Sequence, residues 1–337
     1  MTATPPPLVR RAGAGVRVAG VPTRFLPVLV TFGLFVLMFA VGGVRYEAFA
    51  SGQVLLNLLI DNAFLVVLAV GMTFVILTGG IDLSVGSVVA LSTMVTASAL
   101  RAGWPAPAVI VAVLVGGAVF GLAQGAVIHF LDIQPFIVTL AGLFLARGLC
   151  YVIDLNSIPI NDPLFRAVAQ AAIPLGEDMF ITPSVLVALA VVAVGAYVLH
   201  LTRFGRTVYA VGGSQQSALL MGLAVGRARV GVYVISGFCS ALAGLLFSVY
   251  LLSGYSLSAV GMELDAIAAV VIGGTLLTGG SGFVLGSLLG VLVLGTVQTI
   301  ISFEGTLSSW WVRIVIGLLL LVFVVLQRVL GARTGGP

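Results

Sequence analysis

The sequence predicts an all-α, polytopic membrane protein: a helical bundle of about ten transmembrane helices with no soluble domain. Of its 337 residues, 60% are hydrophobic and only 8% are charged, whereas a typical soluble domain is about 25% charged. So few charges cannot cover a surface that faces water, and so much hydrophobicity excludes a disordered chain. A helical span needs roughly 20 apolar residues, so the length suits about ten spans joined by short loops.

The apolar runs define the expected elements in order. Residues 1–24 carry four arginines and four prolines and predict a basic cytoplasmic tail, ahead of a transmembrane domain over 25–330. The expected spans are 25–43, 55–78, 83–100, 109–130, 135–153, 183–201, 231–252, 264–278, 283–302 and 310–326. A cleavable signal competes for the first run, because Ala48-Phe49-Ala50 resembles a cleavage site, but 19 apolar residues exceed the usual ~7–15 of a signal core. The eighth run is short for a full crossing.

The arginines orient the bundle. All fifteen basic residues are arginine. With the N-terminus inside, ten of them fall on the cytoplasmic side and three outside, which is the positive-inside bias. Both termini, including a C-terminal tail over 331–337, are therefore expected in the cytoplasm. The ten are Arg10, Arg11, Arg17, Arg24, Arg203, Arg206, Arg227, Arg229, Arg328 and Arg333; the three are Arg45, Arg101 and Arg166.

Several chemistries are excluded by the composition. Without lysine there is no Walker A motif, which needs its phosphate-binding lysine. Two histidines and two cysteines do not suffice for a typical zinc site, so no metal or other cofactor is expected in this chain. Cys150 and Cys239 are expected at depths that differ by roughly 12 Å, beyond the ~7 Å reach of a disulfide, and are therefore predicted to be free.

Glycines four apart form two ladders that favour close helix packing. These are Gly117-x₃-Gly121-x₃-Gly125 and Gly282-x₃-Gly286-x₃-Gly290. A partial repeat at an offset of 200 adds a second feature, because the Leu-Thr-Gly-Gly of 77–80 recurs at 277–280. Both copies are expected to end a span that runs inward, and paired glycine breaks of this kind are typical of a transport pathway.

Polar residues within apolar runs are the candidate pathway, because charges at membrane depth are costly and usually functional. The candidates are Asn57, Asp61, Asn62 and Thr73 in the second span, and Asp82 and Ser84 at the head of the third. Asp82 has a structural alternative as the cap of a helix start. Arg147 lies inside the fifth span and is expected to form a structural ion pair with Asp154 or Asp61.

Two loops are long. The expected periplasmic loop 154–182 is acidic and proline-rich, which predicts an irregular cap. In the expected cytoplasmic loop 202–230, Gly212-Gly213 breaks the chain, Ser214 suits a helix cap and Gly222 suits a helix end. The helix expected between them presents Ala218, Leu219 and Met221 for an apolar contact. It is too short to be stable alone, so we expect it to need a partner surface.

Four sequence blocks resemble the ribose-type permease family, the membrane subunits of bacterial ABC sugar importers. They are GMTFVILTGGIDLSVGS at 71–87, the segment 139–148, TRFGRTVYAVGG at 202–213 and ELDAIAAVVIGGT at 263–275. A finer resemblance, to a permease subunit of the galactofuranose importer, is carried by DNAF at 61–64, SIPIN at 157–161 and GTLSSWW at 305–311.

The resemblance implies the partners and the mechanism. It implies a separate ATP-binding subunit that holds ATP and magnesium, a second permease of the same or another kind, a periplasmic sugar-binding protein and a sugar substrate, with no nucleic acid involved. It places the chain in the bacterial inner membrane and implies that the short helix of loop 202–230 binds the ATP-binding subunit.

Trp310-Trp311 is either an interfacial anchor or a sugar-stacking platform. The alternatives are an ion-coupled secondary transporter, with Asp61 and Asp82 as carriers, and a membrane scaffold.

Overall fold

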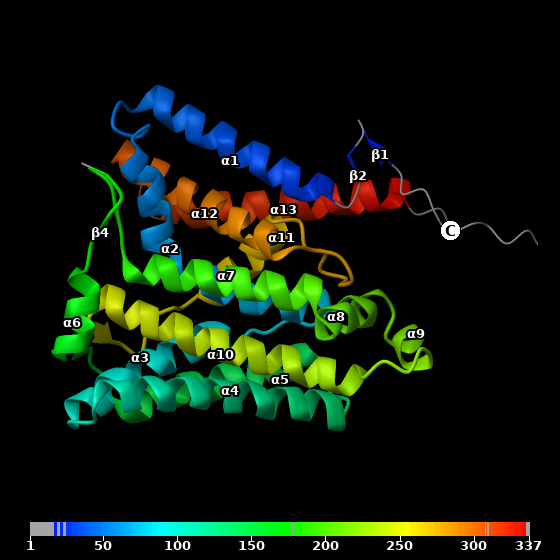
Figure 1. Ribbon diagram of the computed structural model, residues 1–337, viewed down its shortest axis with the longest axis horizontal. Helices are drawn as coiled ribbons and strands as arrows, with labels where there is room; N and C mark the ends of the chain where they lie inside the picture. Colours follow the sequence, from blue (N-terminus) through cyan, green and yellow to red (C-terminus); the bar gives the residue numbers. More distant parts are fainter. Residues whose placement is uncertain are drawn as a thin grey trace, which may run out of the picture.

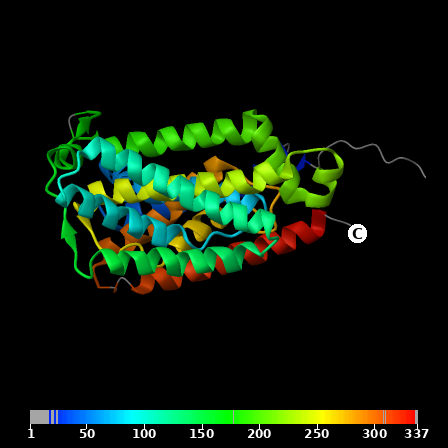
Figure 2. The same ribbon diagram turned by 90° about the horizontal axis from the view of Figure 1, so that it is seen from below.

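The computed structural model describes residues 17–18, 21–22, 25–176, 178–306, 308 and 310–334 and shows a bundle of long helices lying side by side (Figures 1 and 2). Within these residues, eight helices are long and apolar enough to cross a membrane. They are α1 (Leu26–Arg45), α2 (Gly52–Leu77), α4 (Ala106–Phe130), α5 (Pro135–Ile153), α7 (Pro183–Leu201), α10 (Val225–Leu251), α12 (Val284–Glu304) and α13 (Trp310–Thr334). The predicted class, a polytopic helical membrane bundle, is confirmed.

The two other expected spans are shorter. The third corresponds to α3 (Val85–Arg101), an apolar helix of 17 residues. The eighth corresponds to α11 (Met262–Ile272), whose 11 residues extend only about 16 Å at 1.5 Å each, half of a ~30 Å hydrocarbon core. Helix α11 ends early because Gly274 takes a φ of +91° and donates its N–H to the Val271 carbonyl, a glycine C-cap.

Short elements occupy the two ends of the bundle. The expected irregular cap over 154–182 contains α6 (Pro163–Gln170) and the strands β3 (Ile158–Pro159), β4 (Ile173–Pro174) and β5 (Phe180–Ile181). Strand β3 pairs with β6 (Ser253–Gly254), and β4 pairs with β5, both antiparallel. The opposite end carries α8 (Arg203–Gly213) and α9 (Gln215–Leu220), and α13 ends on that side (Figure 1).

The expected tails are described only in part. Of residues 1–24, the structure describes β1 (Arg17–Val18) and β2 (Val21–Pro22), which pair with each other; Arg10, Arg11 and Arg24 lie outside the described residues. At the other terminus, α13 continues through Thr334. The first residues of the expected tail over 331–337 therefore belong to this helix, and residues 335–337 lie outside the described residues.

The centre of the bundle is built on α2 and α10. Within the most apolar 18-residue window of each helix, 78% of the residues are buried in α2 and 61% in α10, against 11% in both α1 and α13. The first glycine ladder packs α4 onto α10, as predicted: a Cβ on Gly121 would lie 2.0 Å from the Tyr233 carbonyl oxygen, and one on Gly117 2.5 Å from that of Gly237. Helices at this distance leave no room for side chains between them. The prediction for the two cysteines is also confirmed, since both are buried free thiols.

Candidate functional site

A buried carboxylate occupies the break between α2 and α3. Asp82 is only 1% exposed. Its Oδ1 accepts hydrogen bonds from the backbone N–H of Ser84 (3.0 Å) and the Ser84 hydroxyl (2.6 Å), and its Oδ2 accepts one from the Ser236 hydroxyl of α10 (2.7 Å). Helix α3 begins at Val85, with Ser84 as its cap residue. Asp82 lies two residues before this cap position. It therefore stabilises the turn that leads into the helix and connects that turn to α10.

Two polar groups beside this carboxylate have no hydrogen-bond partner among the described residues. They are the Nε2 of Gln124, on α4, and the hydroxyl of Tyr233, on α10. A Cβ on Gly142 of α5 would lie 2.0 Å from Gln124 Nε2, and one on Gly80 would lie 2.5 Å from the Tyr233 hydroxyl. The polar cluster thus joins the α2–α3 break to three helices, and glycines give it room.

The polar residues of the second span divide into two groups. Thr73 is fully buried and its Oγ1 shares a hydrogen bond of 2.7 Å with Ser287 Oγ of α12. Asn62, only 4% exposed, donates to the Leu58 carbonyl (2.9 Å) and faces Gly295 of α12. These two residues are enclosed in the contact between α2 and α12.

Asp61 lies in the N-terminal half of α2 and is exposed. It accepts a hydrogen bond of 3.2 Å from the Tyr250 hydroxyl of α10. Phe64 and Phe247 lie beside it, with ring centroids 4.7 Å apart in an edge-on arrangement. A cavity of about 330 Å³ adjoins this group, and its lining includes Phe64, Tyr250 and Gln170.

The six predicted pathway residues therefore do not form one cluster. Asn57 and Asp61, in the N-terminal half of α2, are partly or fully accessible, and Asn57 accepts a hydrogen bond of 2.7 Å from Gln53. The other four, which are Asn62, Thr73, Asp82 and Ser84, are buried between helices. Tyr250 was missed by the sequence analysis, because a tyrosine near the end of an apolar run carries no sign of which helix it will face.

The predicted ion pair of Arg147 requires correction. Its Nη1 donates to the backbone carbonyls of Ser256 (2.5 Å) and Ser258 (2.8 Å), in the loop between α10 and α11. Neither expected partner contacts it, because Asp61 is bonded to Tyr250 and Asp154 to Arg101. The loop explains the difference: its backbone is irregular, with Ala259 at a φ of +58°, and carbonyls of irregular backbone in a membrane protein need donors.

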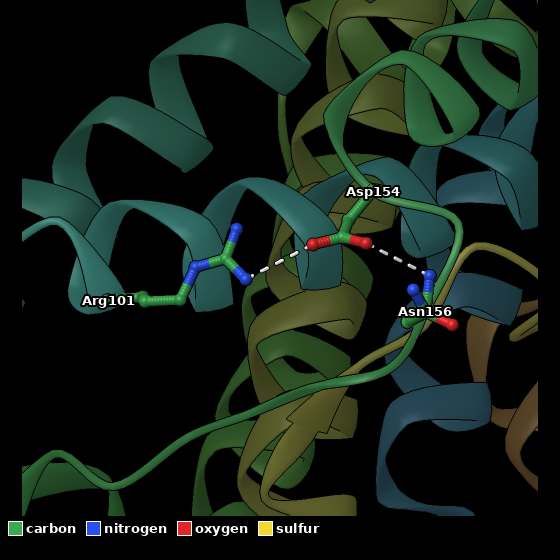
Figure 3. A network of polar contacts seen from close by, with 3 residues as sticks. All are labelled: Arg101, Asp154 and Asn156. Carbon is green, nitrogen blue, oxygen red and sulfur yellow. Dashed lines mark hydrogen bonds and ion pairs between the residues drawn. The ribbon is translucent and has the colours of Figure 1, made fainter.

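Asp154 has a different set of partners (Figure 3). Its Oδ1 accepts from the backbone N–H of Asn156 (3.0 Å), and its Oδ2 lies 3.1 Å from Nη1 of Arg101. The Asn156 N–H and the Arg101 guanidinium both favour the ionised form, so they hold the pKa of the Asp154 carboxyl below its usual value. This ion pair fastens the end of α3 to the loop after α5.

The two glycine breaks meet each other and the end of α8. Gly280 donates its N–H to the Leu77 carbonyl oxygen at 2.9 Å. A Cβ on Gly212 would lie 1.8 Å from that oxygen and 2.4 Å from the Gly280 nitrogen. We call this contact of Leu77, Gly212 and Gly280 the glycine junction. Only the first copy of the repeat ends a helix, with Gly79 at a φ of +78°; the second lies in the loop between α11 and α12, contrary to the expectation.

The structure confirms the expected start and end of the short helix in loop 202–230, which is α9. Ser214 Oγ accepts from the Ser217 N–H at 3.2 Å. Gly222, with a φ of +73°, donates to the Leu219 carbonyl, and Leu223 donates to that of Ala218, which is a Schellman motif.

The exposed face of α9 differs from the one expected. Ala218 is fully buried, so it is not available to a partner as the sequence analysis proposed. Leu219, Leu220 and Met221 are 56%, 84% and 66% exposed. Leu220 was missed because the helix period alone does not tell which side of so short a helix packs against the bundle.

These features define a multi-pass helical membrane protein with paired glycine breaks and a short, apolar helix at one end. A model of the family described as "Branched-chain amino acid transport system / permease component" matches residues 54–324, and the chain belongs to this family. The family consists of membrane components of transporters, and the resemblance to ribose-type permeases is thereby confirmed.

The chain is similar to several curated proteins over nearly its whole length. It is 48% identical to the inner membrane ABC transporter permease protein YjfF of Escherichia coli (strain K12), over 90% of this chain and 92% of that protein. It is 43% identical to the fructose import permease protein FruG of Bifidobacterium longum (93% of each) and 37% identical to the ribose import permease protein RbsC of Haemophilus influenzae (92% of this chain, 96% of that protein). No solved structure matches it.

Proposed function

We propose that this chain is the membrane-spanning permease subunit of a bacterial ABC importer that moves a monosaccharide across the inner membrane by alternating access. The main structural support for this proposal is the glycine junction. Through Gly212, the end of α8 touches both Leu77 and Gly280, so a displacement of α8 and α9 reaches both halves of the chain at once. A permease driven by a separate motor needs such a connection.

The motor is an ATP-binding subunit that holds ATP and magnesium. This chain has no lysine and thus no P-loop of its own. The exposed Leu219, Leu220 and Met221 of α9 offer an apolar anchor, and a short helix seated in an apolar groove is a common recognition mode. Gly212 and Gly213 end α8 before this helix, Ser214 and Gly222 cap its two ends, and Ala218 packs it against the bundle.

The substrate is a sugar, and its identity rests on similarity. Relatives named as fructose and ribose permeases support a monosaccharide, and the finer resemblance favours galactofuranose. We assign Asn57 and Asp61 to the outer part of the path. Asn62, Thr73, Asp82 and Ser84 line helix contacts that have to change when the path opens. A periplasmic sugar-binding protein would dock at the end of the molecule that carries α6, and a second permease would complete the path.

Reconstitution tests this function. The chain is co-expressed with its ATPase and second permease, placed in proteoliposomes, and supplied with the binding protein and labelled D-galactose, D-ribose or D-fructose. We expect uptake that requires ATP and persists when ionophores collapse ion gradients. Uptake that needs no ATP but stops with the ionophore would favour the ion-coupled transporter, and a complex that never forms with an ATPase would favour the scaffold.

The orientation is tested separately. We propose that α6 faces the periplasm and α9 the cytoplasm, with both termini inside. A membrane-impermeant thiol reagent applied to intact cells should label Gln170→Cys and not Ser217→Cys, and inverted vesicles should reverse the result. Labelling of both from one side would contradict this topology.

A further inference from the structure

A cavity of about 800 Å³ lies between α11, α12 and α13, at the outer end of the bundle. Its lining includes Asp265 from the first turn of α11, Gln298 from α12, and Trp310 and Arg313 from the start of α13. Ile301 and Ile316 form an apolar part of the wall. The volume falls within the range of small-molecule sites, roughly 300–1,000 Å³.

The polar groups of this cavity are poorly satisfied by the protein itself. Neither the Asp265 carboxylate nor the Gln298 amide forms a hydrogen bond with any of the described residues. Arg313 donates one long hydrogen bond, 3.4 Å, to the Val260 carbonyl. Gln298 and Arg313 are exposed and Asp265 is partly buried, so these groups are open to a ligand, unlike Asp82, which the serines enclose. Here a carboxylate, an amide and a guanidinium converge on a space that a ligand can enter.

Arg313 is positioned by packing and by a single hydrogen bond, so most of its donors remain free. Its Nη1 lies 2.7 Å from where a Cβ on Gly261 would be, and Gly261 has a φ of +85°. The guanidinium therefore packs over the turn that begins α11, and most of its five N–H groups are free to donate. Asp265 follows one turn later on α11, close enough for its charge to interact with that of Arg313.

The lining has the chemistry that recognises a pyranose or furanose ring. A carboxylate accepts hydrogen bonds from neighbouring hydroxyl groups, and a guanidinium and an amide donate to ring and hydroxyl oxygens. Trp310, 71% exposed, offers a flat apolar face for the C–H groups of the ring and an indole N–H at its edge. Lipid chains do not suit the cavity, because they would leave the hydrogen-bonding groups of Asp265, Gln298 and Arg313 without partners.

We propose that this cavity is a monosaccharide subsite, which receives the sugar on the outer side before the path opens. This deepens the proposed function and rests on it for the biological role. Asp265, Gln298 and Arg313 hold the hydroxyl groups, and Trp310 stacks on the ring. Trp311, which directly follows in the chain, does not line the cavity and serves as the matched control.

The test measures binding directly. The full chain in nanodiscs carries Ser302→Cys, a lining position that is exposed, while the native cysteines are buried. A membrane-impermeant thiol reagent is added with D-galactose, D-ribose or D-fructose, or with mannitol as an acyclic control. We expect saturating amounts of at least one sugar to slow labelling about tenfold, and mannitol to have little effect. Protection should be lost with Trp310→Leu or Asp265→Asn and kept with Trp311→Leu.

The outcomes separate the subsite from the transport function. Equal labelling with and without every sugar, or equal protection by mannitol, overturns the subsite, even if the reconstituted importer takes up sugar. Protection that disappears with Trp311→Leu as strongly as with Trp310→Leu overturns it as well. Protection in a chain that shows no ATP-driven uptake sustains the subsite and refutes the transport proposal. Normal co-purification of each variant with the ATPase confirms that the variant folds.

Discussion

Leu77 and Gly280 are joined by a backbone hydrogen bond of 2.9 Å, although they belong to opposite halves of the chain. Each stands in one copy of the Leu-Thr-Gly-Gly repeat. Gly212 of α8 covers the bond, so closely that any side chain there would overlap the Leu77 oxygen. A shift of any one of these three backbones therefore presses on the other two, so the junction connects α8 with both halves of the bundle.

Gly212→Ala should uncouple this link. The added methyl would lie 1.8 Å from a carbonyl oxygen, and such overpacking typically costs about 1–3 kcal/mol. Because 1.4 kcal/mol is a factor of ten, we expect ATP-driven uptake to fall about tenfold or more, while the ATPase still co-purifies.

The neighbouring glycine provides the control. A Cβ on Gly213 would meet nothing within 4 Å, so Gly213→Ala should leave uptake close to the wild-type level. Equal effects of the two substitutions, measured in the same proteoliposomes, would show that the junction does not transmit the motion.

The sequence predicted the bundle, most spans and the caps of α9, because each depends on local composition and on residues within one turn. It did not predict what the chain brings together from a distance. Asp61 and Arg147 were assigned to the right helices, but their partners, Tyr250 and the carbonyls of the 256–258 segment, come from another part of the chain. The second Leu-Thr-Gly-Gly copy was misplaced for a local reason, because Gly273-Gly274 ends α11 before that copy begins.

Leu220→Glu should weaken the complex with the ATP-binding subunit. Leu220 is 84% exposed, and an apolar anchor replaced by a charge typically costs an interface more than about 1 kcal/mol. Pull-down of the ATPase should drop severalfold and uptake should drop with it. Gln215→Glu, on the opposite side of the same helix, adds the same charge and should bind normally; matched losses in both variants would place the docking surface elsewhere.

Arg147→Leu should destabilise the protein without changing its sugar preference. The substitution removes two hydrogen bonds from a charged donor, each worth about 1.5–3 kcal/mol, and leaves the carbonyls of Ser256 and Ser258 without a donor. We expect a loss of about 2–4 kcal/mol in the free energy of unfolding, seen as a lower Tm. Arg166→Leu, at an exposed position of α6, is the control. A stable variant with altered sugar preference would make Arg147 a pathway residue.

Asp61→Ala should impair uptake while the ATPase remains bound. The carboxylate is exposed in the N-terminal half of α2, and Tyr250 donates a hydrogen bond of 3.2 Å to it. Tyr250→Phe, which removes only the donor, should have a smaller effect of about fivefold, because such a bond contributes about 1 kcal/mol. Asp178→Ala removes an exposed carboxylate from the loop before α7 and should transport normally. Wild-type uptake with Asp61→Ala would return this residue to a structural role.

The ion pair of Asp154 and Arg101 should make stability depend on pH on the acid side. The pKa of Asp154 is lowered in the folded protein, so the unfolded chain binds the proton more readily. The stabilisation is therefore fully present above the unfolded pKa, about 3.9, and is lost as the pH falls through the lower, folded value. The Tm of the wild type should exceed that of Asp154→Asn at pH 7, and the difference should shrink below about pH 4.

Salt should reduce the difference in Tm between the wild type and Asp154→Asn at pH 7, because Arg101 is exposed and salt screens its charge. The backbone N–H of Asn156 donates to Asp154 whatever the salt concentration, so part of the difference should survive. Thermal unfolding of both proteins over a grid of pH and salt checks this. A difference in Tm that is the same at pH 3 and pH 7 would show that the carboxylate charge contributes nothing, and that only the shape of the side chain at 154 holds α3 to the loop after α5.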